Sequence, residues 1–85
     1  MNPGSATELE ILIIDDDPFV RESIQLFLES EEFRVRSANG GEQGLELLNQ
    51  QEPDVALVDL RMPRMNGLEV LREIKKIAPE VEVVM

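Results

Sequence analysis

The chain has 85 residues, of which 42% are hydrophobic and 31% charged, as is ordinary for one small globular domain. Its formal net charge of −10 is compatible with solubility alone or with acids that converge on a divalent cation. Cysteine and histidine are both absent, which excludes disulfides, thiolate metal sites and histidine-based acid–base catalysis. No apolar run is long enough to span a bilayer and the negative charge argues against binding to nucleic acid, so we expect a cytoplasmic domain without membrane or direct nucleic-acid contact.

The first part of the chain predicts a leader, a strand and a helix. Residues 1–8 are small and polar, and we expect a flexible leader there. The apolar run 9–14 is rich in Ile, as is typical of a strand buried on both faces. Asp17 and Pro18 are suited to begin a helix, which we predict over 19–30. Its predicted inward residues are Val20, Ile24, Phe27 and Leu28, and its predicted outward residues are Arg21, Glu22, Gln25 and Glu29.

The remainder continues the same alternation of strand and helix patterns. Asn39 marks a turn, Pro53 and Pro79 interrupt the chain, and Gly67 is most simply a turn residue that needs a positive φ. The predicted elements are a strand over 33–37, a helix over 42–50, a strand over 55–60, a helix over 68–78 and a fourth strand over 81–85.

The order βαβαβαβ with short connections predicts an α/β fold, a doubly wound parallel sheet with helices on both faces. In a flavodoxin-like arrangement the strand order is 2-1-3-4, so the first and third strands are neighbours at the point where the order reverses. Ligands of such sheets bind beyond the carboxyl ends of the strands. We therefore expect Asp15 and Asp16, which follow the first strand, to meet Asp59, which ends the third.

Three carboxylates at one place require either a proton or a cation among them, because their charges repel. Oxygen ligands with few carboxylates suit Mg²⁺, and a carboxylate beside Mg²⁺ is a competent nucleophile toward a phosphoryl group. Each feature alone also has a simpler interpretation. The run Asp15–Asp17 can be a solvated helix start, and Asp59 a loop residue. Met62 and Met65 are most simply apolar residues that fill gaps.

Two segments taken together resemble the signature segments of CheY-like receiver domains of two-component response regulators. They are ILIIDDDP over 11–18 and VALVDLRMPRMNGLEV over 55–70. The second contains the pattern Asp-x-x-Met-Pro-x-Met-Asn-Gly, which is highly specific. The resemblance runs in register from about residue 10 to residue 85, so we expect a CheY-like, partial receiver domain over 9–85.

The resemblance implies a role for each acidic position. Asp59 matches the phosphoacceptor, which takes a phosphoryl group from a histidine of a sensor histidine kinase or phosphotransfer protein. Asp16 matches the direct Mg²⁺ ligand, Asp15 the acid that acts through a coordinated water, and Arg61 the residue whose backbone carbonyl completes the metal shell. The implied protein is a signalling domain rather than an enzyme, and it assists at most its own phosphorylation and dephosphorylation.

The resemblance is incomplete after the fourth strand. Members of the family continue with a Ser or Thr, a helix, a fifth strand ending in Lys and a final helix, none of which this sequence contains. We expect an open apolar edge formed by Val81, Val83 and Val84, and a bare face on the first helix. Both features predict self-association, through the fourth-strand edge or the first-helix face.

Two other functions are compatible with parts of the pattern. The first is a non-phosphorylated interaction module, which keeps the fold for dimerisation or docking and would not react with a phosphodonor. The second is a phosphatase of the haloacid-dehalogenase type, which also uses an Asp at a strand end. That family requires a second Asp two residues after the nucleophile, where this sequence has Arg61.

Overall fold

The computed structural model describes residues 9–85, so the predicted leader over 1–8 lies outside the described residues. The elements in chain order are β1 (Glu10–Ile14), α2 (Pro18–Ser30), β2 (Arg34–Ala38), α3 (Gly41–Gln50), β3 (Val55–Val58), α4 (Gly67–Ile77) and β4 (Glu82–Val84). All the predicted strands and helices are present, with ends that differ by one or two residues. Among residues 9–85, none of the helices is long and apolar enough to cross a membrane.

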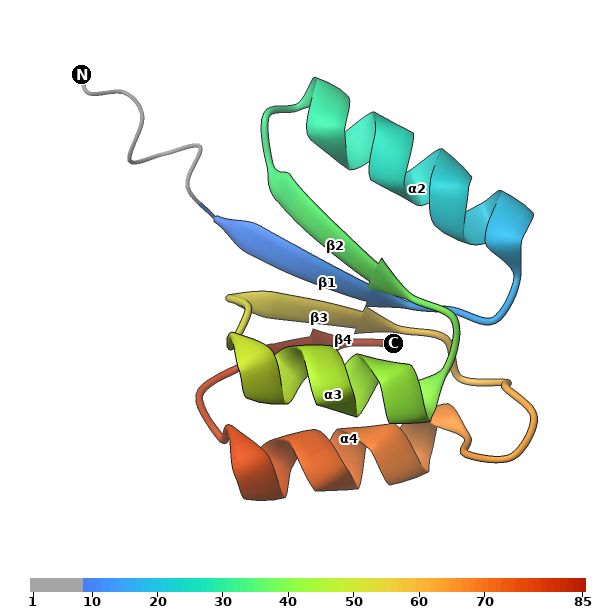
Figure 1. Ribbon diagram of the computed structural model, residues 1–85, viewed down its shortest axis with the longest axis vertical. Coiled ribbons are helices and arrows are strands. Elements are labelled where there is room, and N and C mark those ends of the chain that lie inside the picture. Colours follow the sequence, from blue (N-terminus) through green and yellow to red (C-terminus); the bar gives the residue numbers. More distant parts are fainter. Residues whose placement is uncertain (1–8) are drawn as a thin grey trace.

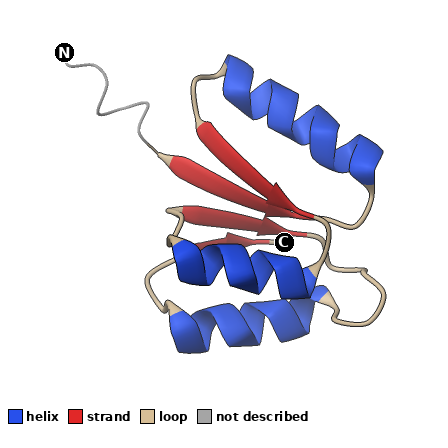
Figure 2. Cartoon of the chain, viewed as in Figure 1, coloured by secondary structure: helices blue, strands red, loops and turns tan. Residues whose placement is uncertain are grey.

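The four strands form one parallel sheet in the order β2-β1-β3-β4, as predicted. The arrowheads of the strands therefore all point toward one end of the sheet (Figure 2). Helices α3 and α4 lie together on one face, and α2 lies on the other (Figure 1). The central strand β1 is buried along its whole length, which agrees with its unbroken apolar sequence.

The main core lies between the sheet and the pair α3–α4. It is built from alternate strand residues such as Leu12, Ile14 and Ala56, against Leu48 of α3 and Ile74 of α4. All five are fully buried. The ends of β1 and β3 lie beside each other because Ile14 pairs with Val58, which places the groups that follow the two strands at one point.

Helix α2 is less buried than its sequence pattern indicated. Ile24 and Leu28 are half-buried, but Val20 and Phe27, which we predicted to face inward, are 38% and 63% exposed. The helix packs mainly against β2 and β1, at one side of the sheet. Only a narrow stripe of the helix therefore contacts protein, and no residue of α2 is buried.

The predicted apolar edge at the end of the chain is also smaller than expected. Val81 does not contribute to it, because it precedes β4 and is 2% exposed within the core. Val81 lies in the turn between α4 and β4, where its N–H donates to the Ala78 carbonyl. Val83 packs against the core as well, which leaves Val84 as the exposed valine of this strand.

Candidate functional site

The carboxyl end of β1 leads directly into a turn that carries two of the predicted acidic residues. Asp15 remains nearly buried at 9% exposure, and its N–H still donates to the Ala38 carbonyl of β2. Its carboxylate accepts a hydrogen bond from the Asp17 N–H at 2.9 Å. Asp17 in turn caps α2, since its Oδ1 accepts from the N–H groups of Phe19 and Val20. Asp16 lies between these fixed residues and is exposed.

Asp59 reaches the same place from β3. Its N–H donates to the Ile14 carbonyl at 2.9 Å, which extends the pairing of β1 and β3 by one residue. Asp15, Asp16 and Asp59 each offer a carboxylate oxygen, and these atoms all lie within 4.8 Å of one another. The structure thus brings Asp59 together with two adjacent acids that lie 43 and 44 positions earlier in the sequence.

Arg61 contacts this group through its backbone. Its N–H lies 3.3 Å from Asp59 Oδ1 and donates to it, while the residue as a whole is exposed. This bond fixes one oxygen of the Asp59 carboxylate. The role of the Arg61 carbonyl as a metal ligand stays a prediction.

The donor set fits a small hard cation. Its side-chain groups are carboxylates, which are ligands that Mg²⁺ prefers, and the exposure of Asp16 gives solvent access from one side. The repulsion among the acids also favours a cation at this place. Burial raises the pKa of Asp15 above its ordinary value, and the charges of Asp59, Asp16 and Asp17 raise it further, while the Asp17 N–H lowers it. A bound cation would relieve this repulsion.

The raised pKa of Asp15 predicts a pH-dependent effect of Asp15→Asn in metal-free buffer. Asn keeps an oxygen that can accept the Asp17 N–H but loses the charge. A carboxyl whose pKa is raised by folding contributes stability that is fully present below its unfolded pKa of about 3.9 and is lost as the pH rises through the folded pKa. The variant should therefore gain stability relative to the wild type as the pH rises through this window. Urea unfolding at several pH values measures the difference, and a difference that stays constant with pH would contradict the assignment.

Gly67 has a different reason to be glycine from the one the sequence indicated. No described glycine has its φ in the left-handed region, so the predicted turn requirement at Gly67 is wrong. A Cβ at this position would lie 2.6 Å from the Asp59 carbonyl oxygen and 2.8 Å from the Leu60 Cα. The start of α4 packs directly against the backbone of the acidic loop, and only glycine permits that approach.

Asn66, the residue before Gly67, forms a capping box with Glu69 at the start of α4, which we did not predict.

We expect Gly67→Ala to destabilise the fold by about 1–3 kcal/mol, the usual cost of forcing an added methyl group into a packed site. The clash is with backbone, which cannot rotate away. Gly40→Ala is the matched control, because a Cβ there has nothing within 4 Å and its extended backbone suits any residue. Thermal unfolding of both variants checks this, and equal midpoints would show that the approach at Gly67 is not restrictive.

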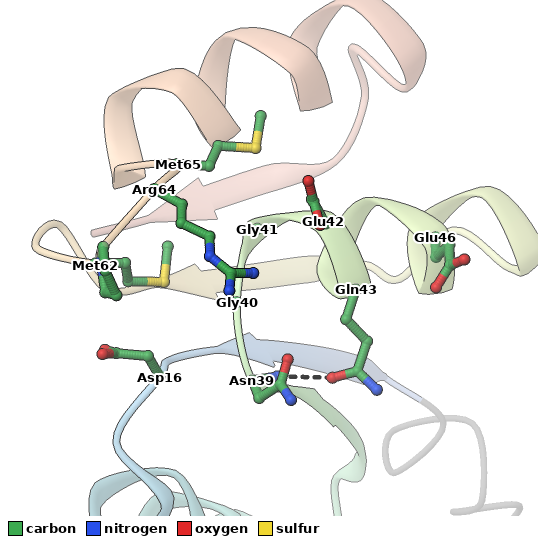
Figure 3. Close-up of a pocket in the computed structure, with 11 residues that line it drawn as sticks. Asp16, Asn39, Gly40, Gly41, Glu42, Gln43, Glu46, Met62, Arg64 and Met65 are labelled. Carbon is green, nitrogen blue, oxygen red and sulfur yellow. Dashed lines mark hydrogen bonds between the residues drawn. The ribbon is translucent and has the colours of Figure 1, made fainter.

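A groove of about 830 Å³ opens beside Asp16. Its walls are the loop between β2 and α3 and the loop between β3 and α4, with Met62 and Met65 supplying apolar surface (Figure 3). The Arg64 side chain extends across it toward Gly40, and the Asn39 N–H is held by Gln43 (Figure 3). Arg64 has a φ of 66°, a left-handed backbone that the sequence did not reveal.

One further residue near the acids was assigned to the wrong side of its helix. We predicted Arg21 on the outer face of α2, but its Nη1 donates to the backbone carbonyl of Asp15 at 2.7 Å. No sequence pattern signals this contact, because helical periodicity does not specify the direction of a long side chain near the helix start.

The comparisons with known proteins, by sequence and by structure, agree with one another. Residues 11–85 match the model of the response regulator receiver domain. The transcriptional regulatory protein GlrR of Escherichia coli K12 is 37% identical over 75 residues, which cover 88% of this chain and 17% of that protein. The chain thus spans about a sixth of that relative.

Two solved structures show the same fold at similar identity. The N-terminal domain of a response regulator receiver protein from Methanoculleus marisnigri has a TM-score of 0.83 at 36% identity, covering 87% of this chain and 62% of that one. TrrA from Thermotoga maritima, crystallised in complex with Mg²⁺-BeF, has a TM-score of 0.84 at 32% identity, covering 88% and 65%.

Proposed function

Since this chain belongs to the response regulator receiver domain family, we propose that it accepts a phosphoryl group on Asp59 for signal transduction. The donor is the phosphohistidine of a sensor histidine kinase or a phosphotransfer protein, and the reaction depends on Mg²⁺. The observation that carries this proposal is the meeting of three carboxylates within 4.8 Å at the ends of two adjacent strands.

Each residue of the site has a distinct task in this reaction. An oxygen of Asp59 attacks phosphorus while the bond from phosphorus to the donor nitrogen breaks, which leaves an acyl phosphate on Asp59. The Arg61 N–H holds the other Asp59 oxygen in position. Asp15, Asp16, Asp59 and the Arg61 carbonyl would hold Mg²⁺, which supplies charge neutralisation for the transferring oxygens. The Mg²⁺-BeF complex of TrrA supports this assignment by analogy.

Incubation with Mg²⁺ and a small phosphodonor such as acetyl phosphate tests the proposal directly. We expect the intact mass to increase by one phosphoryl group, and we expect EDTA to prevent the increase. The alternative, a non-phosphorylated interaction module, predicts no increase in either condition. A folded wild-type chain that neither gains mass nor responds to BeF₃⁻ would therefore reject the phosphoacceptor role.

We also propose that the chain self-associates through its exposed apolar surfaces. On α2, Phe19, Leu26 and Phe27 are 77%, 70% and 63% exposed, and β4 lies at the edge of the sheet with Val84 51% exposed. Such surfaces favour contact with another chain. We further propose a cytoplasmic location without nucleic-acid contact. The net charge of −10 supports the second part, because duplex binding requires positive side chains, and no helix among residues 9–85 could cross a membrane.

Sedimentation equilibrium should show an average mass that rises with concentration. Leu26→Glu and Val84→Lys separate the two surfaces, because each introduces a charge on only one of them. The variant that lowers the average mass identifies the surface used. A wild-type chain that stays monomeric at high concentration would contradict self-association.

A further inference from the structure

Arg21 connects the first turns of α2 to the backbone of the acidic site. It is the fourth residue of the helix and is half-buried, and its Nη1 donates to the Asp15 carbonyl oxygen at 2.7 Å. A hydrogen bond from a charged guanidinium is among the stronger ones in proteins. The acceptor is a backbone carbonyl rather than a carboxylate, so this hydrogen bond does not neutralise any of the three acids of the site.

The bonded carbonyl belongs to the peptide group that joins Asp15 to Asp16. A peptide group is planar, so fixing the carbonyl oxygen of Asp15 also fixes the nitrogen and Cα of Asp16. The next peptide is held from the other side, because the Asp17 N–H donates to the Asp15 carboxylate. Within residues 9–85, no hydrogen bond restrains the Asp16 carboxylate itself, so the backbone sets its direction.

We infer that Arg21 is a positioning residue of the acidic site, which orients the Asp15–Asp16 peptide so that the Asp16 carboxylate faces Asp59. The inference rests on the proposed function, in which Asp16 binds Mg²⁺ directly. Without Arg21 the peptide can rotate, and the short distance between the carboxylates of Asp16 and Asp59 is no longer enforced.

The charge of Arg21 makes this inference testable, because its two possible effects on cation binding have opposite signs. As a nearby positive charge, Arg21 repels Mg²⁺, and its removal should tighten binding. As a positioning residue it organises the ligands, and its removal should weaken binding. Loss of a group that orients a metal ligand typically costs about 10–100-fold in affinity.

Calorimetric titration with Mg²⁺ at constant ionic strength distinguishes the two effects. We expect Arg21→Ala to bind at least about 10-fold more weakly than the wild type, and Arg21→Lys, which keeps a charged donor, to recover part of the loss. Arg72→Ala is the matched control, since it removes the same charge from an exposed position on α4. Binding by Arg21→Ala that equals or exceeds the wild type overturns the inference. If Arg21→Ala does not fold, Arg21→Gln, which keeps a polar side chain but loses the charge, is judged by the same criterion.

A metal-free measurement keeps the inference separate from the proposed function. Hydrogen exchange of the Asp17 amide, which donates to the Asp15 carboxylate, should accelerate in Arg21→Ala and stay unchanged in Arg72→Ala when followed by NMR. Unchanged exchange in Arg21→Ala rejects the positioning role even if the wild type binds no Mg²⁺. Absence of Mg²⁺ binding by the folded wild type, by contrast, rejects the proposed function alone.

Discussion

Asp59→Asn is expected to reduce Mg²⁺-dependent phosphorylation to background while the fold stays intact. Asn has nearly the same shape but lacks the anionic oxygen that attacks phosphorus. The fold should survive because the strand-end bond at this position, to the Ile14 carbonyl, is donated by the backbone N–H and does not involve the side chain. Intact mass after incubation with acetyl phosphate measures the loss, and circular dichroism verifies the fold.

Glu46→Gln provides the matched control for Asp59→Asn. Glu46 is an exposed carboxylate that lines the groove beside Asp16, so this variant removes the same charge close to the site but outside the three converging acids. It should be phosphorylated like the wild type. Mass increase in Asp59→Asn would show that another residue is the acceptor, and equal loss in both variants would indicate an effect of overall charge.

The second large effect is expected for Arg36→Ala, which should destabilise the fold by about 3 kcal/mol. Arg36 Nε donates to Glu10 Oε2 at 2.7 Å, and the other guanidinium nitrogens donate to the carbonyls of Leu47 and Gln51 at the end of α3. Gln51 also donates to Glu10. The variant leaves the Glu10 carboxylate, whose side chain is only 9% exposed, without its charged partner. Such a loss is a large share of the stability of a small domain.

Urea unfolding of Arg36→Ala and Lys76→Ala compares a partly buried ion pair with an exposed one. The Lys76 side chain is 72% exposed, and its pair with Glu73 spans 3.3 Å on the surface of α4. Exposed pairs contribute about 0.2–1 kcal/mol, so this control should change stability little. Equal losses in the two variants would mean that the Arg36 network does not hold α3 to the sheet. The network lies at the opposite end of β1 from the acids, so Mg²⁺ binding by the remaining folded protein should persist.

The sequence by itself determined the features that depend on local periodicity and on residue type. The apolar run of β1 predicted a fully buried strand. The alternation of elements predicted a parallel, doubly wound sheet, and a flavodoxin-like arrangement of that sheet has the observed order β2-β1-β3-β4. With that order, the positions of Asp15 and Asp59 at two strand ends implied that they meet. The capping role of Asp17 was likewise readable, because a cap acts on the next few residues.

Only the tertiary structure decided which side chains reach across the molecule. The sequence placed Arg21 outward, assigned Gly67 to a turn, counted Val81 as part of an edge and gave no sign of the pair between Arg36 and Glu10. Each of these depends on the distance between two backbone segments that are separated in the chain or on the direction of one long side chain. Periodicity determines neither, because those distances depend on helix docking and strand register, which involve residues far apart in the chain.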